Sequence, residues 1–178
     1  DTSVAGLKII PSSIHLTGAT VELVDAQGRE FLLKKALAGI KSSFDYLFID
    51  CPPSLGLLTV NGLTAADAVL IPLQCEYYAM EGLSMLLQTI RRVQGNLNPD
   101  LKIGGILFTM YDVRTRLAHE VVKEVSGYFK EKVFSTIIPR NVRLSEAPSY
   151  GKPISQYDPG SIGARSYQKL AEEVLRYV

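Results

Sequence analysis

Short apolar runs alternate with amphipathic stretches of helical length along most of this chain. Five runs have the length and the apolar or β-branched content of strands: residues 6–11, 46–50, 68–72, 103–108 and 133–138. Four stretches with apolar residues at three- and four-residue spacing are predicted to be helices: residues 31–40, 79–93, 117–129 and 164–178. Such alternation is typical of βαβ units. We therefore predict an α/β fold with a mainly parallel, twisted sheet and helices on both faces.

The chain has 178 residues, of which 47% are hydrophobic, so it can bury a core of its own. We find no internal repeat, low-complexity tract or linker, and we predict a single domain over residues 1–178. Residues 11–30 are interpreted as a loop followed by a short helix. The sequence has no run of eighteen apolar residues and no secretory signal at residues 1–5. We expect a cytoplasmic protein that does not use a membrane.

Charge is distributed unevenly along the sequence, although the formal net charge is only +1. Residues 1–100 hold seven Lys or Arg and ten Asp or Glu, whereas residues 101–178 hold twelve and eight. The basic second part suits a surface that meets an anion such as DNA, and scattered solvated charge explains the count equally well. Cys51 and Cys75 have no metal-ligand spacing with the two histidines and are interpreted as small buried residues.

The most informative stretch is the apolar run 46–50, which ends in Asp50 and is followed by Pro52 and Pro53. In a parallel sheet this places Asp50 at the carboxyl edge, where α/β proteins bind ligands. In P-loop NTPases an aspartate of this kind holds Mg²⁺ or its bound water beside the phosphates of the nucleotide. Taken alone, the pattern fits equally an aspartate that caps the next helix.

Further blocks follow Asp50 in the sequence. They are 50–56 (Asp-Cys-Pro-Pro-Ser-Leu-Gly), Asn61, 72–78 (Pro-Leu-Gln-Cys-Glu-Tyr-Tyr), 138–148 (Ile-Pro-Arg-Asn-Val-Arg-Leu-Ser-Glu-Ala-Pro), 151–154 (Gly-Lys-Pro-Ile) and 157–158 (Tyr-Asp). In this order and spacing they resemble the ParA/Soj family of DNA-partitioning ATPases, from about residue 6 to the C-terminus. Several blocks in register are more specific than any one motif.

The resemblance implies a role for each matching residue. Asp50 would be the Walker B aspartate, a catalytic residue that holds Mg²⁺ through water. Five residues would form the walls of an adenine pocket: Thr109, Met110, Pro139, Arg140 and Asn141. Arg114 and Arg143 would contact DNA, because a guanidinium makes forked bonds to phosphate. Without the resemblance, Met110 and Pro139 would be read as core and turn residues, and each arginine as part of a solvated face.

The resemblance also implies a function. The intact protein would bind ATP and Mg²⁺, form a homodimer around the nucleotide and coat DNA without sequence preference at the nucleoid. It would hydrolyse ATP when a ParB-type partner binds. Two alternatives stay open: a MinD-like ATPase that positions the division site at the membrane, and a non-catalytic fragment that binds a partner.

The sequence departs from the family at its start. The family opens with a strand, a Gly-rich loop with two lysines and a helix. No segment of the 178 residues fits the pattern G-x-x-x-x-G-K-[ST] of such a loop. Gly151-Lys152 is followed by Pro153 and lacks the strand–loop–helix setting. Because the chain also begins at Asp1, we expect a truncated piece without the P-loop and the N-terminal strands. Such a piece would bind ATP weakly or not at all and be inactive alone.

Overall fold

The computed structural model describes residues 1–177, and the chain divides into two compact units, residues 1–66 and residues 67 onward. Each unit is described by itself, and a single domain over residues 1–178 stays a prediction. The last predicted helix ends at Val178, which lies outside the described residues. Within residues 1–177, no helix is long and apolar enough to cross a bilayer.

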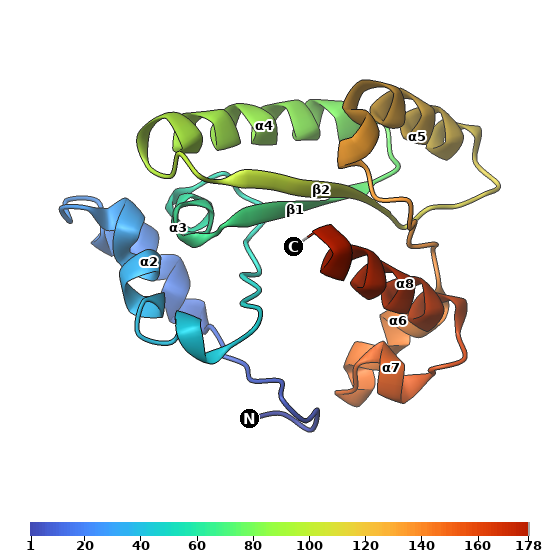
Figure 1. The fold of residues 1–178 in the computed structure, drawn as a ribbon, viewed down its shortest axis with the longest axis horizontal. Helices are drawn as coiled ribbons and strands as arrows, with labels where there is room; N and C mark the ends of the chain where they lie inside the picture. Colours follow the sequence, from blue (N-terminus) through green and yellow to red (C-terminus); the bar gives the residue numbers. More distant parts are fainter. Residues whose placement is uncertain (178) are drawn as a thin grey trace. The chain divides into compact units, whose positions relative to one another are not determined.

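The first unit is built from short helical elements joined by turns (Figure 1). They are η1 (Ile14–Gly18), α1 (Ala19–Glu22), η2 (Arg29–Phe31), α2 (Leu32–Leu37), η3 (Lys41–Ser43) and α3 (Leu57–Ala65). The loop and short helix predicted for residues 11–30 correspond to η1, α1 and their flanking turns. The helix predicted at 31–40 is α2, which is shorter because Phe31 belongs to the 3-10 helix η2 and residues 38–40 form turns.

Two predicted strands of the first unit, residues 6–11 and 46–50, are not strands in the described structure. Their apolar side chains are largely exposed: Ile10 is 78% and Phe48 is 83% exposed. A strand exists only where a neighbouring backbone supplies its hydrogen bonds. Both segments are apolar, but within the described residues no neighbouring strand pairs with them.

The second unit contains a parallel pair of strands, β1 (Ala68–Gln74) and β2 (Lys102–Thr109), as predicted for residues 68–72 and 103–108. The register runs from Ala68 opposite Lys102 to Gln74 opposite Thr109, with one irregularity between Val69 and Leu70. The helix α4 (Ala79–Asn96) connects the two strands, which makes a βαβ unit. The α/β class with a parallel sheet is therefore confirmed.

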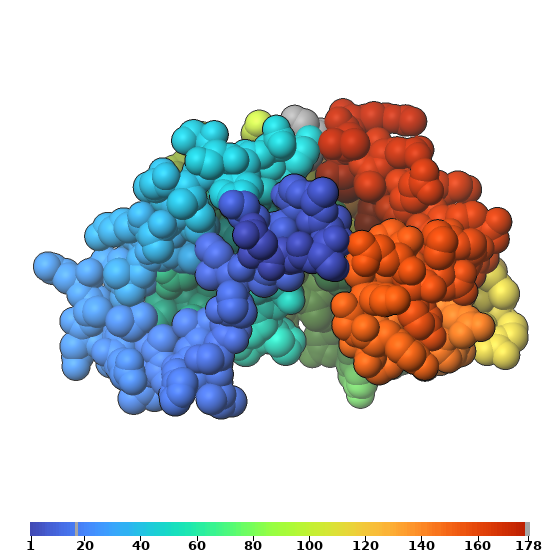
Figure 2. Space-filling model, turned by 90° about the horizontal axis from the view of Figure 1, so that it is seen from below, coloured from blue at the N-terminus to red at the C-terminus, as the bar shows by residue number. Residues whose placement is uncertain are grey.

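Helices lie on both faces of these strands (Figure 1). On one face lie α4 and α5 (Arg116–Phe129), and on the other lies α8 (Ile162–Tyr177). Between α5 and α8 the chain forms η4 (Lys130–Lys132), α6 (Val142–Glu146), η5 (Ala147–Tyr150) and α7 (Ile154–Tyr157). Figure 2 shows the segment with α6, α7 and α8 as an orange and red surface.

The core of the second unit follows from the alternation of β2 side chains. Leu107 is buried in a cluster with Phe134, Ile138 and Leu170, and the last of these belongs to α8. Ile106 and Phe108 point to the opposite face, and both are at most 1% exposed. Both faces of β2 are thus covered, which is typical of strands in parallel sheets.

The fifth predicted strand, residues 133–138, runs beside β2 but pairs with it through one isolated bridge, between Ile106 and Val133. The amide of Phe134 donates to the carbonyl of Ile106, and the amide of Ile138 donates to that of Phe108, both at 2.9 Å. Between these bonds, the amides of Ser135 and Thr136 are turned away to the carboxylate of Glu173 in α8, at 2.6 and 3.0 Å. This diversion explains why the segment is not a regular strand.

Candidate functional site

Asp50 lies in the first unit at the end of an extended segment, and it is exposed. The turn that follows is held against α3: the hydroxyl of Thr59 donates to the carbonyl of Ser54, and the carbonyl of Pro52 lies 3.4 Å from the same hydroxyl. Gly62 makes this contact possible, because a Cβ there would lie 2.6 Å from the sulfur of Cys51. Cys75 is buried as expected, whereas Cys51 is exposed, because its segment is not covered by a sheet.

The helix α3 is itself fixed by the buried side chain of Asn61. Its amide donates to the carbonyls of Arg29 and Leu57, at 2.9 and 3.0 Å, and its oxygen accepts the amide of Leu33 at 3.1 Å. A single side chain thus joins η2, α2 and α3. The family motif identified Asn61 in the sequence, and the structure gives it a purely architectural place behind the Asp50 turn.

A magnesium ion at Asp50 would have to find most of its ligands elsewhere. Among the residues that the structure describes, no group of three His, Cys, Asp or Glu could hold a metal ion. Mg²⁺ commonly keeps several waters and binds one or two protein carboxylates together with substrate phosphates. The single carboxylate of Asp50 fits a site of this kind, in which water and phosphate supply the other ligands. Asp50 provides an exposed carboxylate for that arrangement.

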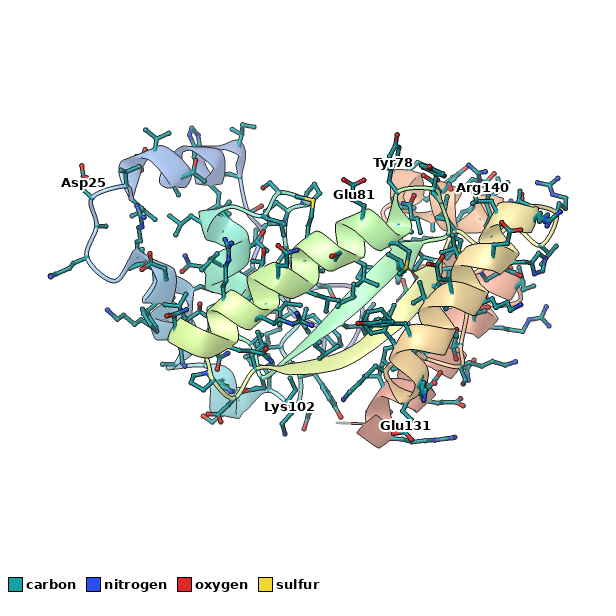
Figure 3. All side chains as sticks on the ribbon, turned by 90° about the horizontal axis from the view of Figure 1, so that it is seen from above. Asp25, Tyr78, Glu81, Lys102, Glu131 and Arg140 are labelled. Carbon is teal, nitrogen blue, oxygen red and sulfur yellow. The ribbon has the colours of Figure 1, made fainter. Side chains whose placement is uncertain are left out.

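In the second unit, the carboxyl ends of β1 and β2 meet at one edge. Gln74 pairs with Thr109 at the end of the ladder, and β1 continues directly into the turn before α4. Figure 3 shows Tyr78 and Arg140 at this end of the strands and Lys102 at the opposite end. Because ligands of α/β proteins bind outside the carboxyl ends of the strands, this edge is the candidate site.

The residue after β2, Met110, has a backbone φ of 53°. This left-handed conformation is uncommon for a residue other than glycine, and it occurs often at ligand sites, where the surrounding structure enforces it. The Met110 side chain is 42% exposed. A flexible apolar side chain is therefore presented at the edge of the sheet rather than in the core.

The segment 139–141 is joined to the residues after Met110 by the backbone. The amide of Tyr111 donates to the carbonyl of Ile138 at 3.1 Å, and the amide of Arg140 donates to the carbonyl of Tyr111 at 2.9 Å. These two bonds bring together the five residues for which we expect an adenine contact: Thr109, Met110, Pro139, Arg140 and Asn141. We call them the purine patch.

Asn141 supplies the polar group of the purine patch. It precedes α6, makes no side-chain cap bond to that helix, and its Oδ1 is buried without a hydrogen-bond partner in the described structure. An unpaired buried acceptor is costly, and a native structure usually has a reason for one. The exocyclic amino group of adenine is a donor that could satisfy it. The patch thus combines an apolar side chain with an unsatisfied acceptor, as small-molecule sites commonly do.

The two arginines expected at DNA are both in the second unit, and both are paired with carboxylates of their own chain. Arg114 precedes α5, and its Nε and Nη2 donate to the two carboxylate oxygens of Asp112 at 2.8 and 2.6 Å. These hydrogen bonds hold the pKa of Asp112 well below its ordinary value. The Arg114 side chain is nevertheless 81% exposed. It can therefore be reached by an anion that competes with Asp112.

Arg143 lies in α6 between two carboxylates. Its Nη1 donates to Glu146 at 2.9 Å, and its Nε lies 3.4 Å from Asp158. The hydroxyl of Tyr157 also donates to Glu146, so hydrogen bonds from Arg143 and Tyr157 lower the pKa of Glu146. The Arg143 side chain is 54% exposed. It is held more firmly than a solvated surface arginine.

Sequence reasoning missed one residue of the edge, Tyr111. Its backbone provides both bonds between the two halves of the purine patch, and its hydroxyl lies 2.9 Å from Nδ1 of His119 in α5. A contact between the end of a strand and the following helix has no periodic signal in the sequence. Its place directly after the expected contact residue Met110 was the only available indication.

Comparisons with known proteins found a matching family model and similar proteins. A family model described as AAA domain matches residues 1–103. The chain is 66% identical over 174 residues to the chromosome-partitioning ATPase Soj of Treponema pallidum, and it is 60% identical over 173 residues to the sporulation initiation inhibitor protein Soj of Bacillus subtilis. These matches cover 98% and 97% of the chain and 69% and 68% of the relatives.

A solved structure is also similar to this chain. Cobyrinic acid a,c-diamide synthase from Mycobacterium smegmatis, with a bound ATP analogue and magnesium, superposes with a TM-score of 0.77 at 42% identity. The match covers 94% of this chain and 61% of that one. The chain thus spans about two thirds of the length of the proteins that it matches.

Proposed function

We propose that this chain, which belongs to the Soj/ParA family of chromosome-partitioning ATPases, forms the larger part of an enzyme that couples ATP hydrolysis to the segregation of DNA. The family membership rests on the high identity over nearly the whole chain. To this enzyme the residues of this chain would contribute a purine patch, a magnesium-side carboxylate and a basic surface.

The observation that carries the proposal is the purine patch at the carboxyl edge of β1 and β2. Met110 and Pro139 offer apolar contact to the faces of a base, and the unpaired Oδ1 of Asn141 would accept a hydrogen bond from the 6-amino group of adenine. The carbonyl and hydroxyl of Thr109 add polar groups at the same edge. A base with a 6-keto group would instead present an acceptor to Asn141, so the patch favours ATP over GTP.

Asp50 is proposed as the magnesium-side carboxylate. When bound, Mg²⁺ would neutralise charge on the β- and γ-phosphates. Asp50 would accept hydrogen bonds from the waters of the ion, and the Thr59 and Gly62 contacts would keep the turn after Asp50 against α3. The relative with a bound ATP analogue and magnesium supports these two ligands.

DNA, a second copy of the chain and a ParB-type protein are proposed as partners. Arg114 and Arg143 would contact phosphates, since both are exposed and phosphate can compete for a guanidinium that is paired with a carboxylate. Phosphate contacts carry no base information, so DNA of any sequence would bind alike. The place of action would be the nucleoid in the cytoplasm, with a nucleotide-bound homodimer as the form that binds DNA.

The test uses the full-length protein, by which we mean this chain together with the phosphate-binding loop that the family carries. Asp50→Ala should reduce magnesium-dependent ATP hydrolysis by at least about tenfold, because outer ligands of a metal commonly account for 10- to 100-fold of activity. Asp45→Ala is the matched control, since Asp45 is an exposed carboxylate at the start of the same segment. Hydrolysis that is unchanged in Asp50→Ala would refute the role of Asp50. Wild-type protein without ATPase activity would refute the proposed function.

A further inference from the structure

Tyr111 is the residue through which the two halves of the purine patch are joined. Its amide donates to Ile138 and its carbonyl accepts from Arg140, so its backbone is fixed on both sides. Met110 precedes it directly, and Pro139 lies opposite it in an isolated parallel bridge. A shift of Tyr111 would therefore move Met110 relative to Asn141.

The side chain of Tyr111 is anchored on α5 by His119. The hydroxyl lies 2.9 Å from Nδ1 of His119, and the two rings meet edge to face with centroids 5.6 Å apart. The other ring nitrogen, Nε2, lies 3.0 Å from the carbonyl of Val113. Because a carbonyl can only accept, Nε2 carries a hydrogen, and in the neutral imidazole Nδ1 accepts the hydroxyl hydrogen of Tyr111.

These hydrogen bonds run in one direction, from Tyr111 to His119 and from His119 to Val113. They tie two residues of the connection between β2 and α5, Tyr111 and Val113, to His119 in α5. The strained residue Met110 lies at the strand end of this connection. A backbone in an unfavourable conformation persists only where neighbouring contacts hold it there.

We propose that Tyr111 and His119 are positioning residues that set the base selectivity of the site, on the basis of the proposed ATP-binding function. Neither residue belongs to the purine patch. They act through the backbone of Met110 and Arg140. This backbone holds the side chain of Met110 and the Oδ1 of Asn141 in a fixed relative position. Loss of the hydrogen bond between Tyr111 and His119 should loosen this backbone. The binding of adenine, which needs both groups, should then weaken more than the binding of guanine.

The experiment measures the dissociation constants of MgATP and MgGTP by competition with a fluorescent nucleotide, using the full-length protein. Tyr111→Phe and His119→Ala should each weaken ATP binding about 3- to 10-fold, in the range for one lost hydrogen bond, with GTP binding unchanged. The double variant should be no worse than either single variant, since both remove the same bond. His119→Asn should restore part of the ATP affinity, because its amide oxygen replaces Nδ1 as an acceptor.

Tyr128→Phe is the matched control, because Tyr128 also lies on α5, is 75% exposed and packs edge-on against Phe129. It should bind both nucleotides like the wild type. A general loss of stability would lower the affinity for ATP and GTP together and would contradict the inference. The inference is also overturned if Tyr111→Phe and His119→Ala keep the wild-type ratio of ATP to GTP affinity. If the wild-type protein binds no ATP, the proposed function is wrong and the inference falls with it.

Discussion

The two units of the molecule use their apolar segments differently. In the second unit, β1 and β2 pair over seven positions, and Ile106 and Phe108 are almost completely buried. In the first unit, residues 6–10 and 46–50 have similar composition, but Ile10 and Phe48 are mostly exposed. Apolar composition alone therefore does not make a strand, because the backbone also needs a partner.

The units also differ in what holds them together. The second unit has a contiguous apolar cluster around Leu107, Phe134 and Leu170. In the first unit, two hydrogen bonds of Asn61 tie α3 to α2 and η2. Hydrophobic burial is the larger stabilising term in proteins, so the second unit should be the more stable one.

The largest expected effect comes from truncating the same residue type in the two units. Phe108→Ala should lower the free energy of unfolding by about 3–5 kcal/mol, because it leaves a cavity in a closed core. Phe48→Ala should change it by less than about 0.5 kcal/mol, because Phe48 is exposed. Urea unfolding followed by circular dichroism measures both. Equal losses in the two variants would show that the units do not differ as described.

A smaller effect is expected from the polar centre of the first unit. Asn61→Ala should cost about 2 kcal/mol, because it leaves the amide of Leu33 and the carbonyl of Arg29 without a partner. Asn96→Ala serves as the control, since Asn96 is exposed and its amide donates to the carbonyl of Arg92 within its own helix. Proteolysis rates of the first unit would report the loss. Matching rates for the two variants would contradict the role given to Asn61.

The smallest effect concerns Glu173 in the second unit. Burial raises the pKa of Glu173, and the hydrogen bonds from Ser135 and Thr136 outweigh burial, so the pKa is lowered from the ordinary value of 4.5. The stabilisation is thus present above pH 4.5 and is lost as the pH falls through the lowered pKa. Glu173→Gln should cost about 1 kcal/mol at neutral pH and lose this part of the acid sensitivity.

The control for Glu173 is the adjacent exposed residue Glu172. Glu172→Gln should leave both the stability and its pH dependence close to those of the wild type. Chemical unfolding at a series of pH values between 3 and 7 compares the three proteins. A Glu173→Gln variant with an unchanged pH profile would show that the two amide bonds are not formed in solution.

Much of the second unit could be predicted from the sequence. The positions of β1, β2, α4 and α5 follow from apolar periodicity, which reports how a segment is buried. The same periodicity misled at residues 46–50, because it contains no information on whether a partner strand is present. At residues 133–138 it found the apolar segment but not Glu173, which lies more than thirty residues away and takes two of its amides.

The roles of the candidate site residues stay predictions. The family resemblance implied one pocket for Thr109, Met110 and Pro139, and the backbone bonds of Tyr111 bring these positions to one edge of the sheet. The pairing of Arg114 and Arg143 with carboxylates could not be predicted, because charge counts do not show which groups meet. The hydrogen bond between Tyr111 and His119 was hidden for the same reason.

The most direct test of the account is hydrogen exchange of the full-length protein with and without MgATP, resolved to peptides by mass spectrometry. The account predicts slower exchange in the presence of nucleotide for peptides that cover residues 109–112, 138–142 and 46–52, because we propose that the base contacts the purine patch and that Asp50 serves the metal ion. Peptides from the middle of α4 should not change. Binding of MgATP that leaves residues 109–112 and 138–142 unprotected would contradict the assignment of the purine patch.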